Sequence, residues 1–173
     1  MLCRAWSLLA IAACAGCTPA LDWREVRPVQ SDATVLFPCR PATDSRRVRL
    51  DGQSAEMFIA MCSASGSTFA LSYADVGDPA GVEAALRALR GAAVANVAGS
   101  AQLGDELRVP GATPGPGAAR VHISGRLPDG KPVAIEAAFF ARGTRVFQAS
   151  VISPNRIDAE AVDTFLGGLR VGS

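Results

Sequence analysis

The chain has 173 residues, of which 49% are hydrophobic and 19% are charged. This length fits one domain of ordinary size, and the hydrophobic share excludes a disordered chain because it is large enough to fill a core. The formal net charge is only +1. A chain so close to neutral lacks the general attraction to phosphate that nucleic-acid-binding proteins have, so we expect no nucleic-acid partner.

The N-terminal end has the pattern of a secretory leader, MLCRAWSLLAIAACAGC. Arg4 precedes an apolar run from Ser7 to Ala15. A helix that spans a membrane needs about 20 apolar residues, so this run is too short to span one. A single positive charge before a short apolar run is typical of a signal peptide.

The end of this run resembles the lipobox of bacterial lipoproteins, in which small residues precede a cysteine that becomes lipidated and N-terminal. The resemblance implies a signal peptide over residues 1–16, a lipid on Cys17 and a short tether over residues 17–32. Leucine is usual three residues before the lipidated cysteine, where this chain has Cys14. An ordinary signal cleaved between residues 18 and 20, which would release a soluble periplasmic protein, therefore stays open as the alternative.

Thr18 follows the predicted lipidation site directly. In enteric bacterial lipoproteins, an aspartate at this position is the signal for retention in the inner membrane, and this chain has threonine there. The resemblance therefore implies a location in the cell envelope, on the periplasmic face of the outer membrane. The expected partners are the membrane, through the lipid on Cys17, and an envelope protein that the sequence does not identify.

The five cysteines have three expected fates. Cys3 and Cys14 leave with the leader and Cys17 takes the lipid, so Cys39 and Cys62 remain as an even pair. Such a pair predicts a disulfide in an oxidising compartment. If the first three strands formed a simple meander, the two cysteines would lie about 10 Å apart, whereas a disulfide needs Cα atoms within about 7 Å. Either the first and third strands are neighbours, or Cys39 curls over on its turn.

The periodicity of the rest predicts one domain over residues 33–173. In chain order the expected elements are strands over 33–39, 46–50, 54–63 and 68–76, a helix from Asp78 to about Gly99, a short strand within 101–109, a Pro/Gly loop over 109–117, strands over 119–127, 132–141 and 145–153, and a final helix that Asp158 caps. This order predicts the α+β class, with an antiparallel sheet of about 6–7 strands and helices packed on it.

Four segments resemble the PsbP-like, or DcrB-like, family of α/β/α sandwiches. They are LFPCRP (36–41), GSTFALSYADV (66–76), FFARGTRVFQASV (139–151) and FLGGLRV (165–171). The resemblance covers most of residues 33–171 and implies binding or assembly roles more than catalysis. It supplies no shared catalytic residue.

No set of residues indicates catalysis, a metal site or a cofactor. His122 is the only histidine, so a His-based metal cluster is excluded, and no serine lies in a G-x-S-x-G motif. We interpret His122 as structural or solvent-facing.

Arg47 and Arg49 share one face of a predicted strand and are candidates for binding lipid phosphates or an acidic partner. A solvated strand face is the commoner explanation for arginines in this pattern.

Three functions follow from these observations, in order of preference. The first is a membrane-anchored, non-catalytic envelope lipoprotein that acts as a binding or assembly module. The second is a periplasmic carrier of a small apolar ligand, which needs a cavity of several hundred Å³. The third is an enzyme whose site the sequence does not reveal.

Overall fold

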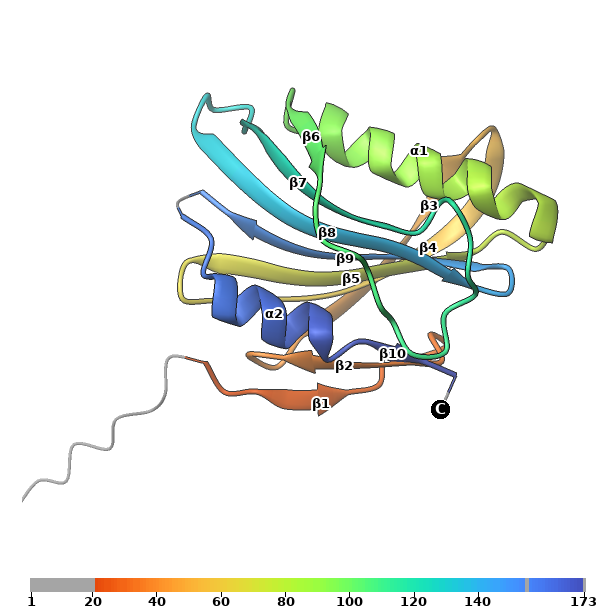
Figure 1. Ribbon diagram of the computed structural model, residues 1–173, viewed down its shortest axis with the longest axis horizontal. Helices are drawn as coiled ribbons and strands as arrows, with labels where there is room; N and C mark the ends of the chain where they lie inside the picture. Colours follow the sequence, from red (N-terminus) through yellow and green to blue (C-terminus); the bar gives the residue numbers. More distant parts are fainter. Residues whose placement is uncertain (1–20, 155, 173) are drawn as a thin grey trace, which may run out of the picture.

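The computed structural model describes residues 21–154 and 156–172 (Figure 1). The predicted signal peptide over residues 1–16 and the predicted lipidation site Cys17 lie outside the described residues. The described chain forms, in order, β1 (Arg24–Val26), β2 (Ala33–Phe37), β3 (Ala42–Leu50), β4 (Gln53–Ala64), β5 (Ser67–Asp75), the 3-10 helix η1 (Pro79–Gly81), α1 (Val82–Ala95), β6 (Ser100–Leu103), β7 (Ala119–Arg126), β8 (Pro132–Arg142), β9 (Arg145–Ser153), α2 (Ala159–Gly167) and β10 (Arg170–Val171).

Seven strands of the described chain form one antiparallel sheet in the order β3-β4-β5-β9-β8-β7-β6. Its first two hairpins turn at Asp51-Gly52 and at Ser65-Gly66. Both residues of each turn have positive φ, 48° and 83° in the first and 49° and 76° in the second. This is the backbone geometry that two-residue hairpins favour. The predicted α+β class, with an antiparallel sheet of about 6–7 strands and helices packed on it, is confirmed.

The large sheet is covered on both faces. Along β8, Ala137 and Phe139 belong to the cluster of buried residues that includes α1, whereas Ala138 and Phe140 belong to the cluster that includes α2 and β2. Successive side chains of a strand point to opposite faces, so both faces of β8 are apolar. Figure 1 shows the resulting layers, with α1 on one side of the large sheet and α2 with the small sheet on the other.

The small sheet has the order β1-β2-β10, so β2 is not a strand of the large sheet. β1 lies within residues 17–32, which the sequence predicts as a tether, and the folded chain therefore begins before residue 33. Trp23, which precedes β1, packs edge-to-face on Phe69 of β5 with ring centroids 6.1 Å apart. Strands of three and two residues such as β1 and β10 are too short to leave a periodic pattern in the sequence.

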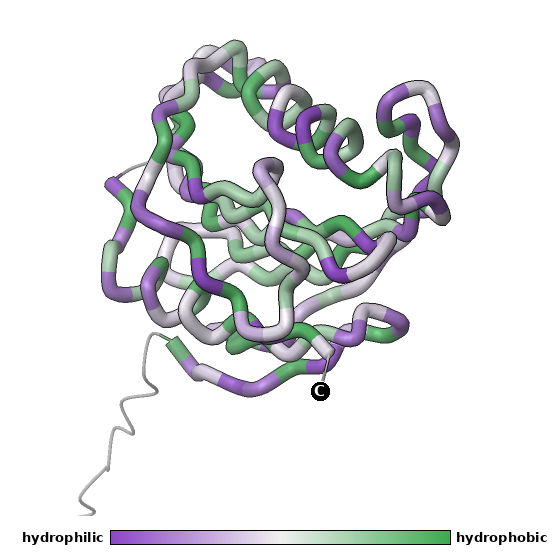
Figure 2. Tube along the Cα trace, turned by 45° about the vertical axis from the view of Figure 1, so that its right-hand side comes forward, coloured by the Kyte–Doolittle hydropathy of each residue, from purple (hydrophilic) through white to green (hydrophobic). Residues whose placement is uncertain are grey.

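Both predicted helices form, and α2 begins at its predicted cap, whereas the predicted cap Asp78 begins a 3-10 turn that precedes α1. The Asp78 side chain accepts a hydrogen bond from the backbone N–H of Ala80, but the first turn is the 3-10 helix η1, and α1 follows it. Asp158 accepts from Glu160 and Ala161 at the start of α2. Figure 2 shows hydrophilic and hydrophobic residues alternating along α1, as expected for a helix with one face on a sheet.

The predicted Pro/Gly loop has no regular element between β6 and β7. Backbone hydrogen bonds hold it on the edge of the domain, with the Thr113 N–H donating to Ala141 of β8 at 2.7 Å and the Val171 N–H donating to Pro110 at 2.9 Å. The loop therefore links the end of β8 with β10 and forms part of the surface next to α2.

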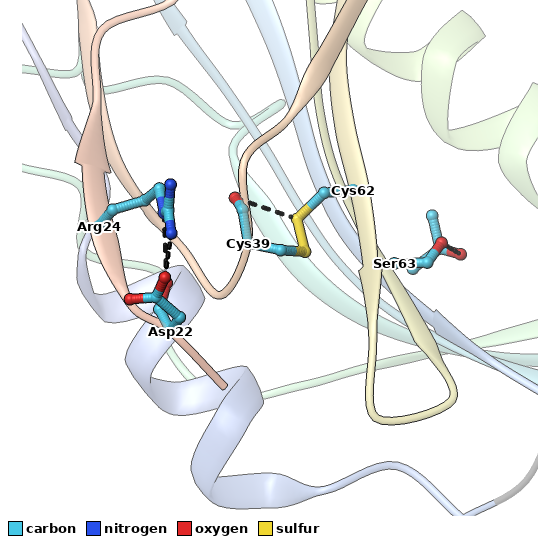
Figure 3. Close-up of a disulfide and its surroundings, with 6 residues drawn as sticks. Asp22, Arg24, Cys39, Cys62 and Ser63 are labelled. Carbon is cyan, nitrogen blue, oxygen red and sulfur yellow. Dashed lines mark hydrogen bonds and ion pairs between the residues drawn. A yellow bond between two sulfur atoms is a disulfide. The ribbon is translucent and has the colours of Figure 1, made fainter. Parts of the chain in front are cut away.

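A disulfide joins Cys39, two residues after β2, to Cys62 of β4 (Figure 3). The two Cα atoms are 6.0 Å apart. The predicted pairing is confirmed, and the distance expected from a meander does not apply, because β2 lies across the face of the large sheet and not within it. The disulfide thus connects the small sheet with the large one.

Loss of this disulfide should destabilise the fold. The bridged cysteines are 23 positions apart, and closing a loop of this size in the unfolded chain corresponds to about 3 kcal/mol. We expect Cys39→Ala/Cys62→Ala to lower the free energy of unfolding in urea by about that amount, and a reducing agent to do the same to the unsubstituted protein. The double variant is the control, since reductant should leave its midpoint unchanged. An unsubstituted protein whose midpoint ignores reductant would contradict the assignment.

Candidate functional site

A group of polar side chains lies on the face of β7 and β8 that is turned toward α2. Arg120, His122 and Ser124 occupy alternate positions of β7, so they share one face of the sheet. Glu136 of β8 lies directly opposite His122 in the strand register. Asp163 of α2 completes the group, which we call the His122 cluster.

The His122 ring connects a hydroxyl with a carboxylate. Its Nδ1 lies 2.8 Å from Oε1 of Glu136, and its Nε2 lies 3.0 Å from Oγ of Ser124. An ionised carboxylate can only accept hydrogen bonds, so in the neutral ring Nδ1 carries the proton and Nε2 is the acceptor for the Ser124 hydroxyl. This order of groups is the one in which histidine acts as a general base toward a serine.

The carboxylate of this cluster is shielded, whereas the ring is reachable from solvent. The Glu136 side chain is 18% exposed and the His122 side chain 36%. Arg120 lies between two carboxylates, with Nε 3.5 Å from Glu136 and Nη2 3.3 Å from Asp163. The Arg120 guanidinium therefore compensates the half-buried charge of Glu136.

A hollow of about 360 Å³ borders the cluster. Its lining combines three members of the cluster with Arg156 and with apolar residues at the start of α2, among them Ile157 and Val162. Arg156 forms no ion pair with any residue of the described ranges. The hollow thus offers one uncompensated cation beside an apolar wall.

A second cavity, of about 480 Å³, is mostly apolar. It lies between the loop that joins β6 to β7 and the core beneath it. The residues that line it include Leu107, Val109, Pro110, Ala112 and Pro114 of the loop, Phe140 of β8 and Gly167 of α2. A volume of this size meets the requirement for a small apolar ligand.

A third, polar hollow lies at the β8–β9 turn, and its charged residues make contacts that stabilise the fold. Arg145 contacts Asp32 at 2.5 Å and Asp75 at 3.8 Å. Hydrogen bonds from the side chain of Thr144 and the backbone N–H of Gly77 lower the pKa of Asp75, the Arg145 charge adds to this effect, and partial burial opposes it. Because Asp32 precedes β2, these contacts fasten the small sheet to the large one.

Tyr73 makes a further contact between the same two parts of the chain. Its hydroxyl donates to the backbone carbonyl of Val29 at 2.5 Å, and its ring stacks on Phe58 with centroids 5.5 Å apart. Burial raises the pKa of Tyr73, and the positive charge of Arg145 opposes the shift. The group is thus a structural hydrogen-bond donor.

The predicted binding residues Arg47 and Arg49 lie on β3, which is an edge strand of the large sheet. Their register partners are Glu56 and Ser54 of β4, and both arginines are exposed on the same face, as predicted. Within the described residues neither guanidinium forms an ion pair. Arg46 is a third exposed cation and points to the opposite face.

The sequence interpretation of His122 missed its two partners. The spacing of His122 and Ser124 within one strand could have indicated that both side chains share a face. Glu136 comes from the next strand, and its position opposite His122 depends on the register of the β7–β8 hairpin, which the sequence does not fix to a single residue.

Neither a metal centre nor a membrane span emerges in residues 21–154 and 156–172. No three histidine, cysteine, aspartate or glutamate side chains in these ranges are placed to hold a metal ion together. Their helices are also too short or too polar to cross a membrane.

No family model, curated protein or solved structure matches the chain.

Proposed function

We propose that the protein is a lipoprotein of the cell envelope that acts as a binding module. In this proposal the lipid on Cys17 holds the domain on the periplasmic face of the outer membrane, and β3 docks an extended, acidic segment of another envelope protein. The observation that carries the binding role is the edge of β3, where three exposed arginines form no ion pair among the described residues.

Two observations support the location in the envelope. The leader pattern ends at Cys17, and the resemblance to the lipobox implies its lipidation. The disulfide between Cys39 and Cys62 fits an oxidising compartment, since thiols stay reduced in the cytosol. Leu21 already packs against the core, so only the three residues 18–20 lie between the lipidated cysteine and the folded chain.

The docking role rests on backbone geometry and charge. β3 has nine residues and, among residues 21–154 and 156–172, pairs only with β4, so its other edge offers backbone groups to an added strand. Acidic side chains of such a strand would meet Arg46, Arg47 and Arg49, and complementary charges favour both encounter and register. Arginines also discourage pairing between identical edges, which directs the edge toward a partner of opposite charge.

The intact mass of the protein extracted from membranes tests the anchor. We expect a chain that begins at Cys17 and carries the mass of a diacyl or triacyl modification. Cys17→Ala should abolish the modification and leave the protein unprocessed or soluble. An unlipidated chain that begins after Cys17 would contradict the lipoprotein assignment and would leave the docking surface to be tested on a soluble protein.

Photo-crosslinking in cells tests the docking surface. We expect a photo-reactive residue in place of Thr43 on β3 to form an adduct with one envelope protein, and the cross-linked peptide to be acidic. The reversal Arg47→Glu/Arg49→Glu should reduce this adduct at least about 10-fold, because like charges would then meet.

Two controls make this experiment decisive. Arg87→Glu/Arg90→Glu on α1 changes the net charge by the same amount on another surface and should leave the adduct unchanged. A photo-reactive residue in place of the exposed Ala92 should not form it. The proposal would be contradicted if the β3 and α1 charge-reversal variants gave the same amount of adduct, or if the cross-linked peptide were basic.

The apolar cavity favours a second candidate function, the transport of a small apolar ligand. We expect a fluorescent apolar probe such as 1-N-phenylnaphthylamine to bind with a stoichiometry of one and to be displaced by a fatty acid. Ala112→Trp should fill the cavity and weaken binding at least about 10-fold, whereas Ala92→Trp on the exposed face of α1 should not. Equal binding by both variants would exclude this cavity as the ligand site.

A further inference from the structure

We propose that Ser124, His122 and Glu136 form a hydrolytic site for small carboxylic esters. The proposal goes beyond a binding module, because it assigns to this domain a reaction. It rests on the order of the three groups and on the hollow that His122 and Glu136 line next to Ser124, and it is independent of β3 and of the apolar cavity.

The geometry supplies a nucleophile, a base and a residue that positions the base. Ser124 is exposed and its Oγ is 3.0 Å from Nε2 of His122, within reach for direct proton transfer. Glu136 holds the other ring nitrogen at 2.8 Å and so fixes the tautomer in which Nε2 is the acceptor. The half-buried carboxylate also stabilises the positive charge that the ring gains during the reaction.

The strand framework holds these three groups in place. Ser124 and His122 are two positions apart on β7, and Glu136 is the register partner of His122 on β8. Both strands have neighbours on each side in the large sheet, so the backbone that carries the site is paired along its length. Arg120 contacts Glu136 from the same face and keeps its carboxylate oriented toward the ring.

The reaction balances with water as the only co-reactant. Oγ of Ser124 attacks the ester carbonyl carbon while its proton passes to Nε2 of His122. The carbon–oxygen bond to the leaving alcohol then breaks, and the alcohol takes the proton from Nε2. Water, deprotonated in the same way, cleaves the acyl group from Ser124, which releases a carboxylic acid and restores the serine.

The hollow beside the cluster defines the substrate class. A volume of about 360 Å³ admits a small acyl group, and Ile157 and Val162 give it an apolar wall. Arg156 lines the same hollow and forms no ion pair among the described residues, so in this proposal it donates to the oxygen that becomes negative in the tetrahedral intermediate. A short-chain ester of an aliphatic acid matches these features.

Labelling of the full-length protein with a fluorophosphonate tests the site. The probe phosphonylates an activated serine with loss of fluoride, and the adduct is measured by intact mass and located by peptide mapping. We expect one adduct, on Ser124, and a release of p-nitrophenol from p-nitrophenyl acetate with the same dependence on Ser124. Ser124→Ala should abolish both.

Matched variants separate activation from accessibility. Ser63 is an exposed serine whose hydroxyl lies 2.9 Å from the Thr68 hydroxyl and not beside a histidine, so Ser63→Ala should leave the labelling rate unchanged. His122→Ala should lower that rate about 10²-fold or more, the usual contribution of a general base. Glu136→Gln keeps the size of the side chain but removes its charge, and it should lower the rate at least about 10-fold.

The cluster has one other physical explanation, in which Ser124, His122 and Glu136 only hydrogen-bond with one another on a solvated face of the sheet and carry out no reaction. That explanation predicts that Ser124 reacts no faster than Ser63 and that Glu136→Gln lowers thermal stability without changing labelling of Ser124. Either result, obtained with variants whose circular dichroism is native, would overturn the proposal.

Discussion

The central strands of the large sheet are apolar on both faces, and the rest of the fold follows from the need to cover them. Phe140 and Phe147 stack between neighbouring strands with centroids 4.9 Å apart, on the face that α2 and the small sheet cover. Phe165 of α2 packs edge-to-face on Phe37 of β2 and on Phe69 of β5, with centroids 5.4 Å away in both pairs. These aromatic contacts join three separate parts of the chain into one layer, which neither a helix nor a small sheet alone could form.

The candidate sites lie where this cover is incomplete. α2 is nine residues long, and the hollow at its start is lined by polar side chains of β7 and β8. This is where Arg120, His122 and Glu136 gather. On the other side of α2 an irregular loop replaces a helix as the cover. Its prolines and small residues cannot fill the space above Phe140, and an apolar cavity remains. One short helix therefore accounts for both a polar hollow and an apolar one.

The sequence predicts the elements of this fold better than their arrangement. Strand and helix periodicity, turn residues and caps locate the long strands and both helices, because each of these signals is local. The position of β2 is not local, since an apolar strand of five residues fits either sheet equally well, and β1 and β10 exist only through their pairing with it. The disulfide can be predicted because an even number of cysteines, two, remains after the leader, but its geometry depends on the position of β2. His122 lacks visible partners in the sequence because Glu136 reaches it only through strand register.

The disulfide also determines how mechanical load would pass through the domain. The N-terminal end enters at β1, and β1 is held to β2 by a register of only three residue pairs. A pull from that end would otherwise peel the small sheet away strand by strand. Cys39 lies two residues after β2 and is covalently joined to β4, so tension that reaches β2 passes into the long paired strands of the large sheet. A domain suspended from its first residues would thus be mechanically reinforced at the point where the suspension meets the core.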